Sequence, residues 1–218
     1  MESGRSYMPV LRFGWLTPGY DLLVRLLLPE RRFRAALLAA ADPAPGERVL
    51  DFGCGTGTLL GMAVAAQPLA RYVGLDPDPQ VLTIAGRKLR RSGAAGAVQL
   101  MAYDGGRIPF PDGHFDKVLC SLVFCNLTPA GKAAALRELR RVLRPAGALH
   151  VVEWGPPAAI WVRPGFWLLR AVGGFVTTGD LAAGALPGYL REAGFREVGE
   201  EQLTHTGFGT LYRYWCRV

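Results

Sequence analysis

Residues 49–57, VLDFGCGTG, have the composition of a buried strand that turns sharply into a helix. Glycines at such a turn permit unusual backbone angles and let a ligand approach the chain closely. The dinucleotide-binding spacing G-x-G-x-x-G is not met, because it would require a glycine at Thr58 or at Leu60. The pattern is instead D-x-G-x-G-x-G, whose acidic residue, Asp51, would repel a pyrophosphate and attract an ammonium or a sulfonium group. We therefore expect a ligand with a cationic amino-acid end.

Two further carboxylates follow the next two predicted strands. Asp76 ends the strand predicted for residues 72–75 and comes 19 residues after Gly57, where a carboxylate can accept hydrogen bonds from ribose hydroxyls. Asp104 follows the third strand, where its carboxylate could accept a hydrogen bond from an adenine amino group. Because the carboxyl ends of parallel strands meet at one edge of a sheet, we expect Asp51, Asp76 and Asp104 to converge on one crevice.

The elements that must position these side chains alternate between helical and strand-like patterns, which predicts an α/β fold with a parallel sheet. Short apolar runs predict strands at residues 49–52, 72–75, 98–101, 115–121 and 148–153. Helices are predicted at residues 17–28, 31–41, 58–66, 79–91, 129–143 and 181–193. Residues 144–147, RPAG, are expected to form the turn that ends a helix. A closing strand pair across a glycine-containing turn is predicted at residues 198–203 and 211–217.

Length and composition fit one domain. The chain has 218 residues, 50% hydrophobic and 20% charged, so it can bury a full core and is not disordered. Four cysteines without a C-x-x-C pair and three histidines argue against a disulfide scaffold and a structural zinc site, and no metal is expected. The sequence shows neither a signal peptide nor a membrane-spanning run, so a cytoplasmic location is expected.

The net charge of +7 permits contact with a nucleic acid or an anionic membrane without requiring it. Many arginines fall on predicted helix faces, and we interpret them as solvated surface. The predicted helix at residues 129–143 and the residue that follows it contribute four such arginines: Arg137, Arg140, Arg141 and Arg144.

Four stretches of the chain resemble the class I S-adenosylmethionine-dependent methyltransferases: VLDFGCGTG, VGLDPDP, YDGGRIPFPDGHFD and LRELRRVLRPAGALHVVE. Their order and spacing match over residues 48–153. The resemblance implies a Rossmann-like, doubly wound, mostly parallel seven-stranded sheet with an antiparallel closing strand and helices on both faces. It also implies methyl transfer (EC 2.1.1.-) with S-adenosyl-L-methionine as cofactor. The residues that it assigns to the cofactor are Tyr20, Asp51, Gly53, Cys54, Gly55, Gly57, Asp76, Pro77, Asp104, Gly105 and Ser121.

Within that class the chain looks most like the ubiquinone/menaquinone biosynthesis methyltransferases (the methyltransferase type 11 group). LTPGYDLLVRLLL resembles their A-x-x-Y-D-x-x-N opening, in which the tyrosine, here Tyr20, lies over the cofactor; Asp21 also matches, and the asparagine does not. FDKVLCSLVFCNL parallels their F-D-x-x-x-x-x-x-x-L-R-N-V, with Asn126 matching and Cys125 replacing the arginine. Because of that replacement the resemblance does not fix a quinol as the substrate. It implies a small, lipophilic acceptor, either a small molecule or a lipid.

Other functions remain open. A phospholipid headgroup methyltransferase at a membrane surface would suit the positive charge and the tryptophan-rich segment after the fifth strand. The glycine spacing argues against an NAD(P)-dependent oxidoreductase. The presence of all three aspartates argues against a nucleotide-binding protein without catalytic activity. No nucleic-acid partner is expected: residues 120–124 lack the Asn/Asp-Pro-Pro-aromatic run of nucleobase amino methylators, and no cysteine follows a proline as RNA cytosine methylators require.

Methyl transfer from a sulfonium requires mainly that the protein align the acceptor and exclude water, with a base only where the acceptor loses a proton. His205 at the closing hairpin and Glu153 at the end of the fifth strand are candidates for such a base or for contact with the acceptor; a structural role is the alternative for each.

One domain over residues 1–218 is predicted, with an N-terminal helical cap at 1–44 and a substrate lid at 155–180. The aromatic side chains of the lid suit a lipophilic acceptor or an approach to a membrane surface. The sequence does not identify the acceptor atom or the oligomeric state.

Overall fold

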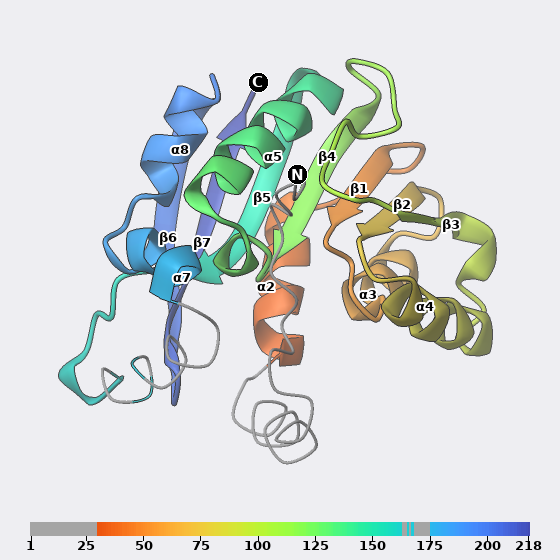
Figure 1. The fold of residues 1–218 in the computed structure, drawn as a ribbon. Helices are drawn as coiled ribbons and strands as arrows, with labels where there is room; N and C mark the ends of the chain where they lie inside the picture. Colours follow the sequence, from red (N-terminus) through yellow and green to blue (C-terminus); the bar gives the residue numbers. More distant parts are fainter. Residues whose placement is uncertain (1–29, 163–164, 166, 168–174) are drawn as a thin grey trace, which may run out of the picture.

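The computed structural model describes residues 30–162, 165, 167 and 175–218 (Figure 1). The strands are β1 (Arg48–Phe52), β2 (Arg71–Asp76), β3 (Val98–Ala102), β4 (Phe115–Ser121), β5 (Leu143–Trp154), β6 (Arg196–Thr206) and β7 (Gly209–Arg217). The helices are α2 (Glu30–Ala41), α3 (Thr58–Ala66), α4 (Pro79–Arg91), α5 (Pro129–Val142), α7 (Phe175–Ala182) and α8 (Leu186–Glu192). Short 3₁₀ turns lie at η1 (Ala95–Ala97), η2 (Phe124–Asn126) and η3 (Ile160–Val162). Tyr20 and the helix predicted at residues 17–28 lie outside the described residues.

Within the described residues, the strands form one seven-stranded sheet in the order β3-β2-β1-β4-β5-β7-β6. β1 to β5 pair in parallel, and β7 runs antiparallel to both β5 and β6. The predicted sheet, with its antiparallel closing strand, is confirmed. The chain leaves β1 toward β2 and leaves β4 toward β5, so the order reverses between β1 and β4, where loops diverge and leave room for a ligand.

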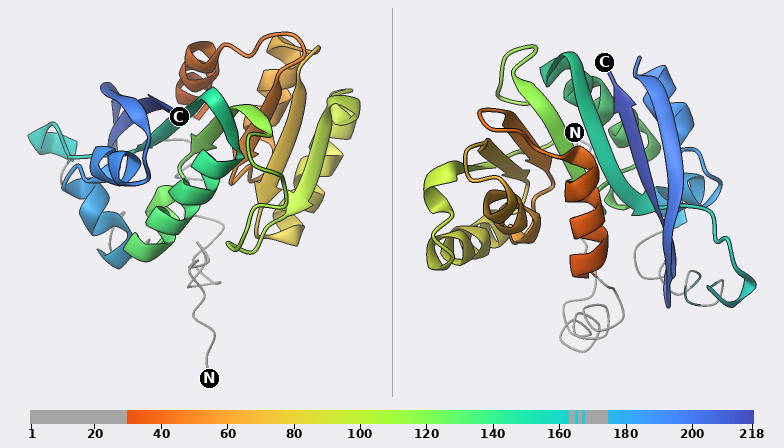
Figure 2. Two further views of the ribbon diagram at one scale, coloured as in Figure 1. Left: turned by 90° about the horizontal axis from the view of Figure 1, so that it is seen from above. Right: turned by 180° about the vertical axis from the view of Figure 1, so that it is seen from behind.

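Two apolar clusters cover the two faces of the sheet, with helices on both sides (Figure 2). One cluster contains side chains of α2, α3 and α4, such as Phe33, Leu60 and Leu89. The other contains side chains of α5 and α8, such as Leu136 and Leu190. Both faces are thus covered, and in open sheets of this kind ligands bind in the loops at the carboxyl ends of the strands.

β5 begins five residues earlier than predicted, directly after α5 at Leu143. Residues 144–147, expected to be a turn, therefore lie inside the strand. Phe115 of β4 pairs with Leu143 and Lys117 pairs with Ala148, so the extra residues form a bulge, in which Ala146 has φ +63°. Strand pairing thus outweighs the turn preference of a Pro-Ala-Gly segment.

The helix predicted at residues 181–193 is divided into α7 and α8. Gly184 has φ +75°, and its amide donates to the Leu181 carbonyl while the Ala185 amide donates to the Asp180 carbonyl. This is a Schellman motif, which ends a helix at a glycine. Pro187 then lies in the first turn of α8, where its missing amide hydrogen is not needed.

Candidate functional site

The glycine-rich turn after β1 has the backbone geometry expected from the sequence. Gly53, Gly55 and Gly57 have φ of +72°, +53° and +71°, in the left-handed region that other residues rarely adopt. A Cβ at Gly53 would collide with Val123, whereas the space beside Gly55 is open. The turn therefore combines a backbone that favours glycine with an open approach at Gly55, and α3 begins directly after it.

Asp76, at the end of β2, joins this turn to the neighbouring strand. Its Oδ2 accepts a hydrogen bond from the Gly55 amide at 2.9 Å, and its Oδ1 accepts one from the Asp78 amide at 3.0 Å. Burial raises the pKa of Asp76, and the two amide hydrogen bonds oppose that shift. A carboxylate offers about four lone-pair positions, so both oxygens can still accept a bond from a ligand hydroxyl.

Asp51 lies in β1 beside the turn and is only 2% exposed. Its Oδ2 is buried and has no hydrogen-bond partner in the part of the chain that the structure describes. Burial raises the pKa of Asp51 to about 7; the charge of Arg34 lowers it and that of Asp76 raises it further. A buried carboxylate oxygen without a donor is unfavourable, so a cation or donor from a ligand would be stabilising there.

β3 leads into a loop, residues 103–114, that begins beside the end of β1. Tyr103 is buried, with its ring edge-on to Phe52 at 5.6 Å between centroids. Its hydroxyl donates to the Gly106 carbonyl at 2.5 Å, and the Gly106 amide donates to Asp104 Oδ1 at 3.1 Å. These contacts fix the backbone around the exposed Asp104, which follows the carboxyl end of β3.

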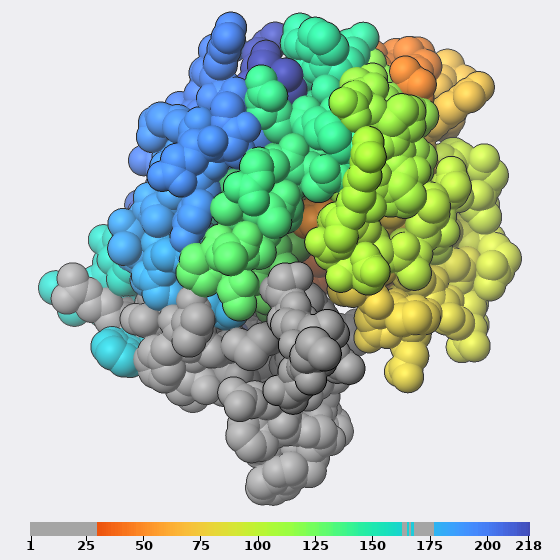
Figure 3. Space-filling view, turned by 45° about the horizontal axis from the view of Figure 1, so that its top comes forward, coloured from red at the N-terminus to blue at the C-terminus, as the bar shows by residue number. Residues whose placement is uncertain are grey.

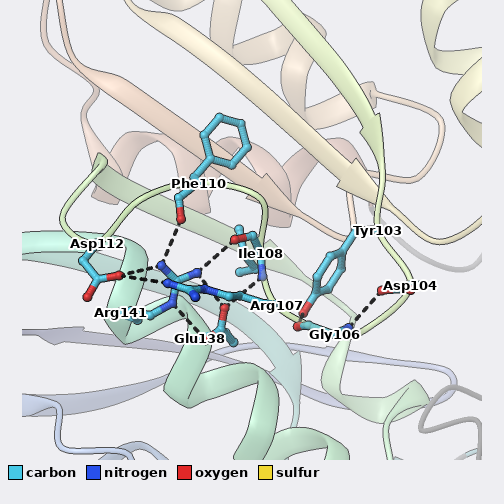
Figure 4. A network of polar contacts seen from close by, with 9 residues as sticks. All are labelled: Tyr103, Asp104, Gly106, Arg107, Ile108, Phe110, Asp112, Glu138 and Arg141. Atoms are coloured by element: carbon cyan, nitrogen blue, oxygen red, sulfur yellow. Dashed lines mark hydrogen bonds and ion pairs between the residues drawn. The ribbon is translucent and has the colours of Figure 1, made fainter.

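Arg141 of α5 holds the rest of this loop (Figure 4). Its guanidinium donates to the carbonyls of Ile108 and Phe110, both at 2.9 Å, and to Asp112 Oδ1 at 2.7 Å. Glu138 accepts from Arg141 at 2.7 Å and from the Ile108 amide at 2.8 Å. The space-filling view shows the loop lying against α5 (Figure 3). Our interpretation of Arg141 as solvated surface is therefore wrong, because it anchors a loop that contains neither helix nor strand.

The structure brings the predicted cofactor residues, apart from Tyr20, to the carboxyl ends of β1 to β4. They are Asp51, Gly53, Cys54, Gly55, Gly57, Asp76, Pro77, Asp104, Gly105 and Ser121. Burial raises the pKa of the Cys54 thiol, and the buried Ser121 Oγ has no hydrogen-bond partner among the residues described. No three His, Cys, Asp or Glu side chains within the described ranges gather so that they could hold a metal ion. Ligand binding by these residues stays a prediction.

Glu153, one candidate base, is fully buried at the end of β5. Its Oε2 accepts from the Cys125 amide at 3.2 Å, and its Oε1 accepts from the Trp154 amide at 2.9 Å. Burial raises the pKa of Glu153, and these amide bonds oppose the shift. Both oxygens thus bind backbone, and Glu153 holds η2 against the end of β5. A role toward the acceptor stays a prediction.

His205, the other candidate, lies in β6 at the edge of the sheet. Its Nδ1 is 3.1 Å from Thr210 Oγ1, its Nε2 is 3.3 Å from Gln202 Nε2, and its ring meets Trp161 at 5.5 Å. Four strand intervals of about 4.8 Å each separate β6 from β1. His205 and the glycine-rich turn therefore occupy different parts of the carboxyl edge, and its role also stays a prediction.

A residue with unusual backbone geometry follows β4, and sequence reasoning missed it. Leu122 has φ +57°, which is rare for a residue with a large side chain. Its carbonyl accepts from Asn126 Nδ2 at 3.2 Å, and its amide donates to the Val152 carbonyl at 2.9 Å. Asn126 thus stabilises the turn between β4 and η2, at the switch point of the sheet. The only sequence signal for this turn was the asparagine four residues further on.

A buried ion pair between α5 and α7 was also missed. Lys132 is fully buried, and its Nζ donates to Asp180 Oδ1 and to the Thr177 carbonyl, both at 2.6 Å. The Tyr189 hydroxyl donates to Asp180 Oδ2 at 2.9 Å. The available signal was that Lys132 shares the apolar face of α5 with Leu136, one helical turn away. The pair fixes α7, which packs against η2.

Residues 49–147 match the protein family described as "Methyltransferase domain". The "Demethylmenaquinone methyltransferase" of Deinococcus radiodurans is 34% identical over 92% of this chain and 85% of that protein. The protein of the same name from Thermus thermophilus is 42% identical over 66% of this chain, and the match spans 65% of that protein. The "Ubiquinone/menaquinone biosynthesis C-methyltransferase UbiE" of Vibrio vulnificus is 30% identical, over 89% of this chain and 82% of that protein.

Among solved structures, a SAM dependent methyltransferase from Aquifex aeolicus superposes with a TM-score of 0.68. The alignment covers 91% of this chain and 97% of that one at 20% identity, a likeness of fold.

Proposed function

Because the chain belongs to the class I S-adenosylmethionine-dependent methyltransferases, we propose that it methylates a small, lipophilic acceptor with an electron-rich ring. A demethylated naphthoquinol is the first such acceptor to test, because the relatives named above are called demethylmenaquinone and ubiquinone/menaquinone methyltransferases. Because Cys125 replaces the family's arginine, the proposal does not specify which ring system the acceptor contains.

The cofactor part of the proposal rests on the buried Oδ2 of Asp51, which has no partner in the described chain and suits a ligand ammonium group. When bound, S-adenosylmethionine supplies a methyl group already activated on a sulfonium. Asp76 would accept the ribose hydroxyls, and Asp104 with Gly105 would contact the adenine. The glycine-rich turn would carry the amino-acid end. The chain's own task is then to orient the acceptor and exclude water, without a strong nucleophile.

The acceptor part rests on the relatives' names and on the apolar sequence after β5. Residues 155–180, proposed as a lid, combine several aromatic side chains with small residues, and apolar walls are typical of sites that take lipophilic ligands. Glu153 and His205 stay proposals for groups that position the acceptor or take its proton.

The experiment follows an isotope-labelled methyl group from S-adenosylmethionine into three separate acceptors. These are a reduced demethylated naphthoquinone, phosphatidylethanolamine vesicles and transfer RNA. The proposal expects label in the naphthoquinol and none in the RNA. Label in phosphatidylethanolamine alone would replace the proposed acceptor with a phospholipid headgroup, and label in RNA alone would refute a lipophilic acceptor.

A further inference from the structure

Three large apolar side chains are exposed on the short segment after β5. Ile160 is 79% exposed, Trp161 is 62% exposed and Trp167 is 60% exposed. The other large apolar side chains exposed in the described structure, Leu69, Ile84 and Trp215, are scattered over distant elements. Isolated exposed apolar residues are ordinary, whereas a group of them indicates a surface that meets another apolar phase. We call the group Ile160, Trp161 and Trp167 the apolar tip.

The segment that carries the tip is fastened to the β6–β7 hairpin. The Ala158 amide donates to Thr210 Oγ1 at 3.2 Å, and the Trp161 ring meets the His205 ring at 5.5 Å. Gly165 packs so closely on the Gly207 carbonyl that no Cβ would fit. Val162, between the exposed side chains, is fully buried. The segment thus buries Val162 and leaves Ile160, Trp161 and Trp167 exposed.

The charges near the tip are cationic. From Gly155 to Thr178 the sequence contains Arg163 and Arg170 and no acidic residue, in a chain of net charge +7. The first turn of α2, with the exposed Arg31 and Arg32, lies at the same end of the molecule as η3 (Figures 1 and 2). Of the acidic groups in α2, α7 and the middle of β6, Glu30 pairs with Arg34 at 2.8 Å, Asp180 pairs with Lys132 at 2.6 Å and Glu201 pairs with Arg213, while Glu200 is exposed. Exposed indoles in an arginine-containing segment without acidic residues are typical of proteins that bind an anionic membrane surface.

We propose that the apolar tip docks on the surface of an anionic phospholipid bilayer, with Trp161 and Trp167 entering the headgroup region. β5 ends at Trp154, so the tip adjoins the carboxyl edge of the sheet and would bring the crevice to a substrate dissolved in the membrane. None of the helices described has the length and apolarity of a membrane span. The reason for docking rests on the proposed lipophilic acceptor, but the docking itself can be measured without any acceptor.

The test is sedimentation of the protein with vesicles of phosphatidylcholine, with and without phosphatidylglycerol. The wild type is compared with W161A/W167A and with Trp215→Ala, a matched control. Trp215 is 37% exposed and lies on β7 against Arg213, toward the strand end remote from the hairpin. The wild type and the control should bind the vesicles that contain phosphatidylglycerol. W161A/W167A should bind them at least about tenfold more weakly, because two indoles no longer enter the interface.

Thermal unfolding and S-adenosylhomocysteine affinity show whether each variant is folded. If W161A/W167A does not fold, tryptophan quenching of the wild type by headgroup-proximal brominated lipids decides instead, and absence of quenching overturns the proposal. Equal vesicle binding by W161A/W167A and the control overturns it too. So does a wild type that binds no vesicles but forms a dimer that W161A/W167A does not form. Vesicle binding without methylation of any lipophilic acceptor would refute the proposed function but would still support the apolar tip as a membrane-docking surface.

Discussion

The carboxyl group of Asp51 is buried in β1, and one of its oxygens has no partner within the described residues. Burial raises its pKa in the folded protein from 3.8 to about 7. Because the folded pKa is the higher one, the associated stability is fully present below the unfolded value and is lost as the pH rises through about 7. Ionisation of Asp51 should therefore lower the free energy of unfolding of the ligand-free protein as the pH rises from 4 to 7.

Asp51→Asn should remove that pH dependence. Above pH 7 the variant lacks a buried charge, so its free energy of unfolding should exceed that of the wild type, by at most about 4 kcal/mol. The difference should shrink as the pH falls toward 4. Thermal unfolding of both proteins without ligand, from pH 4 to pH 8, measures this. Curves that run parallel across the range would mean that Asp51 keeps an ordinary pKa.

Asp76→Ala should weaken the binding of S-adenosylhomocysteine by roughly 1.5–3 kcal/mol, the usual contribution of hydrogen bonds to a charged group. The variant removes the acceptor for the ribose hydroxyls and the bond from the Gly55 amide. Isothermal titration measures the affinity, with Glu192→Ala as the control, since Glu192 is exposed on α8. Equal affinity in the wild type and Asp76→Ala would show that the ribose is bound elsewhere.

At the scale of elements, the loop at residues 103–114 takes its conformation from α5. Arg141 and Glu138 together bind the backbone of Ile108 at both its amide and its carbonyl, and Arg141 also binds the Phe110 carbonyl. The beginning of the same loop carries Asp104. The helix on one face of the sheet therefore helps to shape the proposed adenine contact.

Arg141→Ala should lower the free energy of unfolding by about 2–4 kcal/mol, because it leaves Glu138 and two carbonyls without their donor. It should also weaken S-adenosylhomocysteine binding. Arg137→Ala, an exposed arginine one turn earlier in α5, is the control and should change neither property by more than about 0.5 kcal/mol. Urea unfolding and titration on the same samples test this. An effect of equal size in both variants would refute the anchoring role.

A second prediction at this scale concerns the contribution of the buried Lys132–Asp180 ion pair, between α5 and α7, to the free energy of unfolding. Lys132→Met should lower the free energy of unfolding by about 3–5 kcal/mol, because it leaves Asp180 without its partner. The double variant K132M/D180L should recover part of that loss, since it leaves no unpaired charge. Urea unfolding of the two variants and the wild type measures both values. A double variant less stable than Lys132→Met would show that Asp180 acts mainly through its bond with Tyr189.

For the whole molecule, the features that the sequence predicted are those encoded locally. The glycine-rich turn and Asp76 lie at strand ends that short apolar runs mark, and the parallel pairing of β1 and β2 brings them together. The contact between Lys132 and Asp180 joins residues that only the packing of α7 on α5 brings together. The extension of β5 through residues 144–147 depends on its pairing with β4, which no local pattern shows. Arg141 resembled a surface arginine because its partners lie in a loop before the helix.

The order of the strands brings these parts to one edge of the sheet. The reversal between β1 and β4 places the glycine-rich turn, Asp76 and the loop with Asp104 on one side of the point where the strand order reverses. It places Leu122, η2 and the tip-bearing segment on the other. A cofactor on the first side would thus face an acceptor that approaches from the second. Substitutions on the first side should therefore change the affinity for the cofactor, and substitutions on the second side should change the turnover of the acceptor.

The measurement that tests the central claim most directly quantifies both products of one reaction. Purified protein is incubated with S-adenosylmethionine and a reduced demethylated naphthoquinone, and mass spectrometry follows S-adenosylhomocysteine and the naphthoquinol together. The account predicts that S-adenosylhomocysteine and a naphthoquinol carrying one added methyl group form in equal amounts, and that Asp76→Ala lowers both in parallel. Formation of S-adenosylhomocysteine without a methylated lipophilic product, or of neither, would contradict it.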